Sequence, residues 1–398
     1  MKIAVAKENE LGELRVAQVP DTVSRLVKQG FEVWVEAGAG VGAGYDDAAY
    51  ETAGAKVIAD PALLWGEADI LLKVNPPGKR DGWSKVLRPE MTEPASTSSE
   101  IDWLKPGATL ISFLNPLGDP TVTQQLTQRQ VTAFSMELIP RTTRAQSMDA
   151  LSSQANIAGY KSVLLAAASL PRIFPMMTTA AGTIPPAKVL VLGAGVAGLQ
   201  AIATARRLGA VVEAFDIRPT VKEQVQSVGG NFIAIDLEEK TEAEGGYAKQ
   251  VSGDTQERIR QGLSPYVAKA DVVITTAQVP GKSAPLLIAE ETVAQMKPGA
   301  VIIDLAAESG GNCACSEAGK NVNYQGVTII SPTNLPSTVP VNTSQMYAKN
   351  LLNLVKYLAK DGQLQLNFED DITSGACVTH AGEIRNERVK EALLVVSC

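Results

Sequence analysis

The first feature of this sequence that could do chemistry is the glycine-rich stretch G-A-G-V-A-G at residues 193–198. It follows an apolar run, 188–192, and precedes a helical pattern, so it joins a strand to a helix. Gly193 permits a tight turn, Gly195 lets the backbone approach a pyrophosphate, and Gly198 lets the helix pack on the strand. The free N–H groups at the helix start favour phosphate. The pattern predicts a dinucleotide-binding site.

The residue that would select the nucleotide is Asp216, at the end of the next apolar strand, 211–215. A carboxylate there can accept hydrogen bonds from the adenosine ribose and repel a 2′-phosphate, so NAD is expected rather than NADP. Arg218 leaves the alternative open, because an arginine near this position can receive that phosphate. We include Val196, at the helix start, and Ile217, beside Asp216, in the predicted site.

A second glycine-rich stretch, residues 38–44, fits the same spacing on paper. Tyr45, Asp46 and Asp47 follow it, so a helix would begin only beyond the glycines. The sequence after it also lacks a strand that ends in an acid at the required distance. We interpret residues 38–44 as a turn.

Composition narrows the class of protein. A chain of 398 residues with 45% hydrophobic and 20% charged residues is globular and long enough for two or three domains. Its formal net charge is -7 and the basic residues form no stripe, which makes nucleic acid an unexpected partner. The longest apolar stretch, near residues 163–170, is too short to span a membrane. Four cysteines without a C-x-x-C pair suggest reduced thiols and a cytosolic compartment.

A metal site is not expected. Cys313 and Cys315 are close in sequence, but His380 is the single histidine, and structural zinc needs four Cys or His ligands at characteristic spacings. His380 lies in a polar C-terminal stretch, where we expect it to be solvated.

The elements that must position these residues alternate between short apolar strands and helices, which is typical of βαβ units. Prolines at 185–186 mark a linker or the entry to a strand, the pattern breaks again at 331–336, and residues 344–358 predict one long helix returning to the first domain. The predicted fold class is α/β. It has two Rossmann-like domains with mostly parallel sheets, and a ligand cleft between them. The first domain is discontinuous, 1–145 plus 340–398, and the NAD(H)-binding domain is 160–335.

Two segments interrupt the alternation. Residues 75–100, rich in Pro, Ser, Thr and charge, predict a surface insertion. Residues 236–254 are acidic, contain G-G-Y-A-K at 245–249, and are long for an ordinary loop. Such loops are often lids, although a variable solvated loop fits this segment nearly as well.

One further stretch resembles a known family: P-R-T-T-R-A-Q-S-M-D at 140–149, followed by L-S-S-Q-A-N-I-A-G-Y at 151–160. It is similar to the Arg/Gln/Asp loop in domain I of proton-translocating nicotinamide nucleotide transhydrogenases, in the alanine dehydrogenase/transhydrogenase superfamily. The resemblance covers the whole chain. Other stretches that look like family motifs are 193–198, 222–225, 245–249, 275–277 with 280–282, and 304–307 with 310–313.

The resemblance implies roles for individual residues. Arg141 and Asp149 would hold the nicotinamide carboxamide of NAD(H), with Ser152 close by, because a carboxamide offers both a donor and an acceptor. Gln146 would reach toward the NADP(H) of a partner, and Tyr247 would belong to a mobile loop. Thr276 and Ala277 complete the predicted nucleotide site. Without the family, helix capping and a surface ion pair are the alternative roles for these polar residues.

The resemblance also implies an activity. An NAD(P)+ transhydrogenase of the Re/Si-specific, proton-translocating kind passes hydride between NAD(H) here and NADP(H) on a partner subunit. The implied partners are an NADP(H)-binding domain, a membrane proton-channel subunit and a second copy of this chain, as a homodimer. Many alpha subunits continue into membrane helices, whereas this chain stops at Cys398. We therefore expect a separate domain I polypeptide, cytoplasmic and held on the membrane by its partners.

Two alternatives remain open. Arg15 and Lys73 resemble the substrate-binding residues of alanine dehydrogenase, an NAD-dependent amino-acid oxidoreductase. That enzyme needs a base, and Asn115 stands where its histidine would be expected. The other alternative is a non-catalytic NAD(H) sensor.

Overall fold

The computed structural model describes residues 1–80, 98–237, 252–279, 281–360 and 362–396. The chain divides into two compact units, Met1–Gln154 with Ser337–Cys398, and Ala155–Pro336. The expected boundaries at 145 and 160 lie on either side of the observed one. Helix α7 (Ala150–Ser169) crosses from the first unit into the second, and a continuous helix gives no break in the sequence pattern.

The first unit is built on an eight-stranded sheet of order β21-β20-β8-β7-β4-β1-β2-β3. Its strands are β1 (Lys2–Val5), β2 (Glu32–Glu36), β3 (Lys56–Ile58), β4 (Ile70–Leu72), β7 (Thr109–Ser112), β8 (Thr132–Ser135), β20 (Cys377–His380) and β21 (Glu383–Ile384). Six neighbouring strands of this sheet pair in parallel, in the spatial order β8-β7-β4-β1-β2-β3, and β20 and β21 add an antiparallel edge. The carboxyl ends of the parallel strands therefore share one edge of the sheet.

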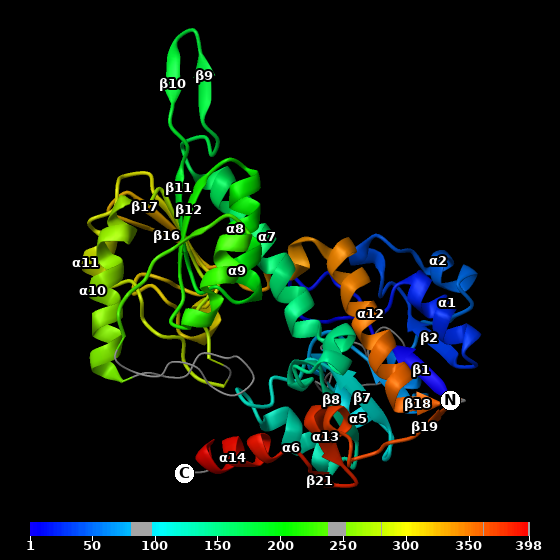
Figure 1. Ribbon diagram of the computed structural model, residues 1–398. Coiled ribbons are helices and arrows are strands. Elements are labelled where there is room, and N and C mark those ends of the chain that lie inside the picture. Colours follow the sequence, from blue (N-terminus) through cyan, green and yellow to red (C-terminus); the bar gives the residue numbers. More distant parts are fainter. Residues whose placement is uncertain (81–97, 238–251, 280, 361, 397–398) are drawn as a thin grey trace, which may run out of the picture. The chain divides into compact units, whose positions relative to one another are not determined.

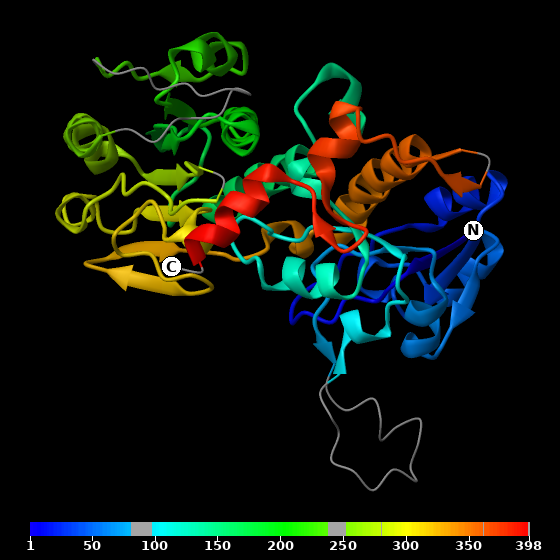
Figure 2. The ribbon, with the colours of Figure 1, turned by 90° about the horizontal axis from the view of Figure 1, so that it is seen from below.

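Both faces of this sheet are buried, because successive side chains of a strand point to opposite sides. Ile3 and Val5 face a cluster that includes α1 and α12, whereas Ala4 faces a second cluster with α3 and α6. Helices thus cover the sheet on both sides (Figure 2). The helices of the unit are α1 (Pro20–Lys28), α2 (Asp47–Thr52), α3 (Pro61–Glu67), α5 (Glu100–Trp103), α6 (Thr121–Gln128), α12 (Pro340–Leu358), α13 (Asp371–Ala376) and α14 (Glu387–Val396).

The second unit has a seven-stranded sheet of order β13-β12-β11-β14-β15-β17-β16. Its strands are β11 (Lys188–Leu192), β12 (Val211–Phe215), β13 (Asn231–Phe232), β14 (Val272–Thr275), β15 (Val301–Asp304), β16 (Asn321–Tyr324) and β17 (Val327–Ile330). All pair in parallel except the edge strand β16. The order reverses at β11, and in open α/β sheets ligands bind beside such a switch point.

Helices cover this sheet on both faces as well (Figure 1). Helices α7, α8 (Val196–Arg207) and α9 (Lys222–Ser227) lie on one face, and α10 (Gly253–Lys269) and α11 (Glu290–Val293) lie on the other. The predicted α/β class with mostly parallel sheets is therefore confirmed.

The smaller strands form three two-stranded sheets, β9 with β10, β5 with β6, and β18 with β19. They are β5 (Lys79–Arg80), β6 (Ser98–Ser99), β9 (Met177–Thr179), β10 (Gly182–Ile184), β18 (Ala359–Lys360) and β19 (Gln363–Leu364). The hairpin β9–β10 precedes the prolines at 185–186 and projects from the second unit (Figure 1). The sequence did not predict it, because its residues are exposed on both faces and show no alternation toward a core.

The structure corrects one expected boundary: the long helix α12 begins at Pro340 rather than at residue 344. His380, which we expected to be solvated, is half-buried in β20, with its Nδ1 3.0 Å from Thr132 Oγ1 and its ring against Phe368. Most of the segments 75–100 and 236–254 lies outside the described residues.

Candidate nucleotide site and polar pocket

The glycine turn joins β11 to α8, the arrangement that its spacing predicts. Gly193 has φ +98°, which side chains rarely adopt, and a Cβ on Gly198 would lie 1.8 Å from Gly193 O. A Cβ on Gly195 would meet no described protein atom within 4 Å. The backbone conformation and packing thus require glycine at positions 193 and 198, whereas position 195 has open space around it among the described residues.

The start of α8 is suited to an anion. Its N-cap is Gly195, which supplies no side-chain hydrogen bond, and the first turn, with Val196, contains no acidic residue. The first N–H groups of a helix have no partner within it, and the aligned peptide dipoles place about half a positive charge there. This helix end can therefore hold a phosphate group.

Asp216 follows β12 and is only 8% exposed. Its Oδ2 accepts a hydrogen bond from Ala194 N at 2.8 Å, which ties the acid to the glycine turn. Arg218 donates its backbone N–H and Nε to Oδ1, both at 2.9 Å, and NH2 to Oδ2 at 2.8 Å. A ribose that formed hydrogen bonds with the Asp216 carboxylate would share the carboxylate with Arg218 or displace the Arg218 side chain. Ile217 packs on the apolar cluster beneath.

Thr276 and Ala277 follow β14 and border the same turn. Thr276 Oγ1 donates to Gly193 O at 3.1 Å, and a Cβ on Gly193 would lie 2.7 Å from that hydroxyl. The structure thus brings the glycine turn, Asp216 and the end of β14 together. Tyr247, expected in this site, lies outside the described residues.

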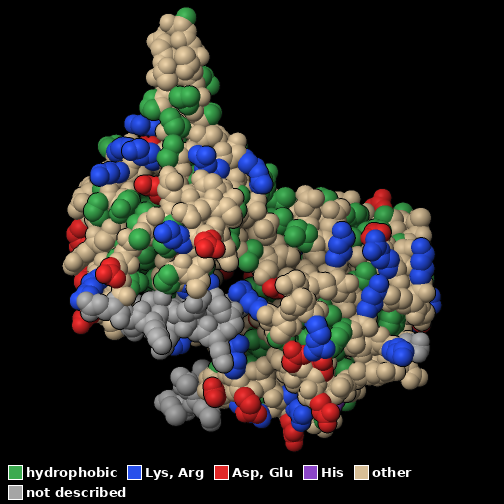
Figure 3. Space-filling model, in the orientation of Figure 1, with side chains coloured by type: hydrophobic (Ala, Val, Ile, Leu, Met, Phe, Trp, Pro, Cys, Tyr) green, Lys and Arg blue, Asp and Glu red, His purple; other side chains and the backbone are tan. Residues whose placement is uncertain are grey.

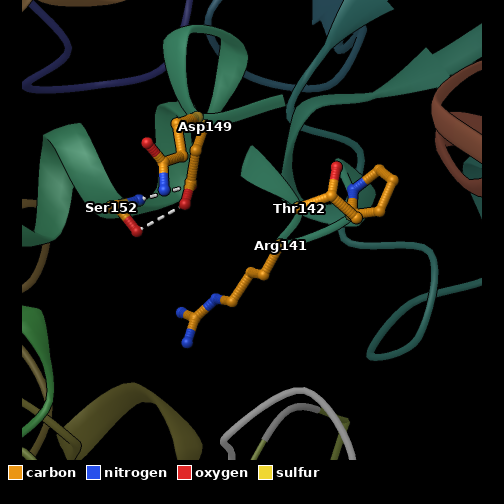
Figure 4. A pocket seen from close by; sticks show the side chains of 6 residues that line it. Arg141, Thr142, Asp149 and Ser152 are labelled. Atoms are coloured by element: carbon orange, nitrogen blue, oxygen red, sulfur yellow. Dashed lines mark hydrogen bonds between the residues drawn. The ribbon is translucent and has the colours of Figure 1, made fainter. Parts of the chain in front are cut away.

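The residues carried over from the family resemblance gather in the first unit. A pocket of about 390 Å³ is lined by Pro140, Arg141, Thr142, Gln146, Asp149 and Ser152. Figure 4 shows the Arg141 side chain extending into the open space of the pocket. Thr142 Oγ1 is buried without a hydrogen-bond partner among the described residues.

Asp149 caps helix α7. Its Oδ1 accepts from Ser152 N at 2.8 Å and its Oδ2 accepts from Ser152 Oγ at 2.6 Å (Figure 4). The helix-capping role considered for these polar residues is therefore present here. Each carboxylate oxygen still has one acceptor position beyond these bonds, so capping leaves Asp149 able to bind a ligand.

The loop between Arg141 and Asp149 is held from two helices. Asn350 and Asn353 of α12 both donate to Ser147 O, at 2.9 and 3.0 Å. Arg144 pairs with Asp370 and Asp371 at the start of α13. These contacts fix the backbone beside Gln146, whose own side chain is exposed.

Arg15 and Lys73 lie in a buried network of opposite charges. Arg15 donates to both oxygens of Glu13, at 2.8 and 2.6 Å, and Lys73 Nζ lies 3.3 Å from Glu8 and 3.4 Å from Glu100. Burial lowers the pKa of Lys73, but the two carboxylates outweigh this effect and leave it raised. Each cation is already paired with a carboxylate of this chain.

Asn115 is exposed at the turn after β7 and has φ +48°. Its backbone N–H and that of Leu114 donate to the buried Glu137 carboxylate, and burial raises the pKa of Glu137. An amide at this position cannot take a proton near neutral pH.

Two surveys of the described residues give further findings. No helix among them is both long enough and apolar enough to cross a membrane. No group of three or more His, Cys, Asp or Glu side chains in the same residues could hold a metal ion.

The fold and the glycine turn define a two-unit α/β protein with a Rossmann dinucleotide-binding domain. Residues 4–158 match the family described as "Alanine dehydrogenase/PNT, N-terminal domain", and residues 162–387 match "Alanine dehydrogenase/PNT, C-terminal domain". The chain belongs to this alanine dehydrogenase/PNT family.

Individual relatives narrow the comparison. A Rhodospirillum rubrum protein named for the alpha subunit of NAD(P) transhydrogenase is 50% identical over 388 residues, which are 96% of this chain and 97% of that protein. The solved structure of a transhydrogenase from Sinorhizobium meliloti has a TM-score of 0.82 at 42% identity, and the match covers 96% of this chain and 100% of that one. An alanine dehydrogenase from Mycolicibacterium smegmatis is 28% identical, over 99% of this chain and 97% of the enzyme. The chain is thus more similar to these transhydrogenase proteins than to this alanine dehydrogenase, and the predicted family is confirmed.

Proposed function

We propose that this chain is the NAD(H)-binding subunit of a proton-translocating transhydrogenase and exchanges hydride with NADP(H) held by a different subunit. The observation that carries the nucleotide-binding part of the proposal is Gly195. Its φ of -73° suits any residue and its Cβ would project into open space, so the fold gives no reason for glycine there. A pyrophosphate lying against the turn gives that reason.

The chain's own groups suit the two ends of the nucleotide. The N-terminus of α8 would hold the pyrophosphate, and Asp216 would accept the ribose hydroxyls and disfavour a 2′-phosphate. Ile217, Arg218, Thr276 and Ala277 would border the nucleotide.

At the nicotinamide end, Arg141 and Asp149 would hold the carboxamide, with Ser152 close by. The bound nicotinamide supplies the hydride chemistry. Transfer between two nicotinamides involves no proton at the reacting carbons, so the site needs orientation and exclusion of water rather than a base. Gln146, exposed on the pocket rim, would contact the partner's NADP(H).

The partners are part of the proposal. They are an NADP(H)-binding domain and a membrane subunit that carries protons, with this chain on the cytoplasmic side. A second copy of the chain is also expected. The hairpin β9–β10 supports the homodimer, since Met177 and Ile184 are 43% and 51% exposed and the hairpin carries no charged side chain (Figure 3). Uncharged, exposed apolar residues are typical of contact surfaces.

An alanine dehydrogenase is the second candidate, supported by the positions of Arg15 and Lys73. The amide of Asn115 argues against it, because oxidising an amine requires removal of a proton. The purified chain with NAD+ is therefore expected to form no pyruvate from alanine. Formation at an ordinary enzymatic rate, on the order of 1–10³ per second, would favour this candidate instead.

Gly195→Ala tests the proposal. The substitution introduces no strain or clash within the described residues, so thermal unfolding is expected to match the wild type. The Cβ would occupy the pyrophosphate position, and the Kd for NADH should rise at least about tenfold. Gly253→Ala is the matched control, because a Cβ there also meets no atom of the described residues within 4 Å. Unchanged NADH affinity in Gly195→Ala would contradict the proposed site.

A further inference from the structure

The end of β14 that borders the glycine turn is held by one buried amide, that of Asn312. Asn312 is 0% exposed. Its Nδ2 donates to Ala277 O at 2.9 Å and to Pro285 O at 2.8 Å, and its Oδ1 accepts from Ala277 N at 3.0 Å. The Asn312 side chain therefore forms hydrogen bonds with both backbone polar groups of Ala277. It also links Ala277 to Pro285, eight residues further along the chain.

Asn312 is in turn held by Asp304, the last residue of β15, which is also 0% exposed. Among the described residues, five groups donate hydrogen bonds to this carboxylate at 2.7–3.1 Å: Asn312 N, Cys313 N, Ser316 Oγ, Thr275 Oγ1 and Ala306 N. Donors of this number offset the cost of burying a charge. The position of Asn312 is thus fixed relative to two central strands of the sheet.

The held residues touch the glycine turn directly. A Cβ on Gly193 would lie 2.7 Å from Thr276 Oγ1 and 3.0 Å from Ala277 N. There is consequently no spare room between the end of β14 and the turn.

We propose that Asn312 is a positioning residue for NAD(H): it holds Thr276 and Ala277 against Gly193 and so sets the shape of the nucleotide site without touching the nucleotide. The inference rests on the proposed function. Loss of the amide frees Ala277 to move, and the site then has to be ordered again each time a nucleotide binds.

Asn312→Ala tests this role, with Asn323→Ala as the control. Asn323 lies on β16 of the same unit, is exposed, and accepts from Gly326 N at 3.2 Å. Titrations with NADH and with ADP-ribose are expected to give Kd values at least about tenfold higher for Asn312→Ala. The Kd for ADP-ribose should rise as much as the Kd for NADH, because the disturbed segment borders the glycine turn. The maximal transfer rate with an NADPH-loaded partner should stay near the wild-type value at saturating nucleotide.

The outcomes separate positioning from stability alone. If Asn312→Ala unfolds at a lower temperature but the folded variant binds both ligands as the wild type does, Asn312 only stabilises the fold and the proposal is wrong. Asn312→Ser leaves a polar group and room for a water, and must show the same weaker binding should the alanine variant fail to fold. A wild-type chain that binds no NADH would instead refute the proposed function itself.

Discussion

Replacing Asp149 with asparagine removes one charge from the polar pocket while preserving its shape. In the wild type the Asp149 carboxylate accepts hydrogen bonds from Ser152 N at 2.8 Å and from Ser152 Oγ at 2.6 Å. In the variant the side-chain oxygen can still accept from Ser152 N, and the amide can donate to the hydroxyl, which reverses its role. The cap of α7 therefore survives, and the free energy of unfolding should fall by about 1 kcal/mol or less.

The effect on binding should be larger. The nicotinamide carboxamide would lose an anionic acceptor, and a hydrogen bond to a charged group contributes about 1.5–3 kcal/mol. At about 1.4 kcal/mol per factor of ten, the Kd for NADH should rise about 10- to 150-fold. ADP-ribose has no nicotinamide, so its Kd should not change.

Isothermal titration of both ligands into the wild type and Asp149→Asn measures the difference. Asp46→Asn is the matched control, because Asp46 caps α2 through Ala49 N at 2.9 Å and lies outside the pocket. Equal weakening of NADH and ADP-ribose would mean that Asp149 acts through the fold. No weakening at all would remove Asp149 from the nicotinamide site.

Three further predictions concern single residues. Asp216→Asn should weaken the binding of NADH and reduce the preference for NADH over NADPH, which competing titrations would measure. An unchanged preference would mean that another residue selects between the two nucleotides. Gln146→Asn should slow hydride transfer strongly while NADH affinity stays within a few-fold, because one methylene is enough to misplace a contact at the reacting centre; equal losses of both would make Gln146 a structural support. Burial, and secondarily Arg385, lowers the pKa of His380 below its usual 6.5. Protonation therefore favours the unfolded chain, and the free energy of unfolding should fall as the pH drops below 6.5, less so in His380→Gln; identical pH profiles for the two proteins would refute the assignment.

The α/β class could be predicted because its signals are local. Short apolar runs such as 189–192 and 301–303 are buried on both faces, and the strand, turn and helix around Gly193 occupy consecutive residues. Other regions depend on contacts distant in sequence. The antiparallel edge pairs Cys377 with Phe134, and neither segment encodes that choice by itself. The hairpin β9–β10 buries nothing in its own unit, so it has no hydrophobic period to detect.

The candidate site divides in the same way. The glycine turn and Asp216 follow from spacing, and the pairing of Arg218 with Asp216 joins residues two apart at a strand end, a pattern that close reading could have found. Asn312 holds Ala277, 35 residues away, and Thr142 has a buried hydroxyl within an exposed loop. Those relations exist only once the chain has folded. The role of the Arg141–Asp149 loop follows from the family resemblance, not from its residue pattern.

Hydride transfer in a mixture of two proteins tests the central claim most directly. The purified chain is given an NAD+ analogue whose reduced form absorbs at its own wavelength, and an NADP(H)-binding transhydrogenase domain loaded with NADPH is added. The account predicts reduction of the analogue only when both proteins are present, and much more slowly with Gln146→Asn. Absence of transfer by two folded proteins, each shown to hold its nucleotide, would contradict it and favour a non-catalytic NAD(H) sensor.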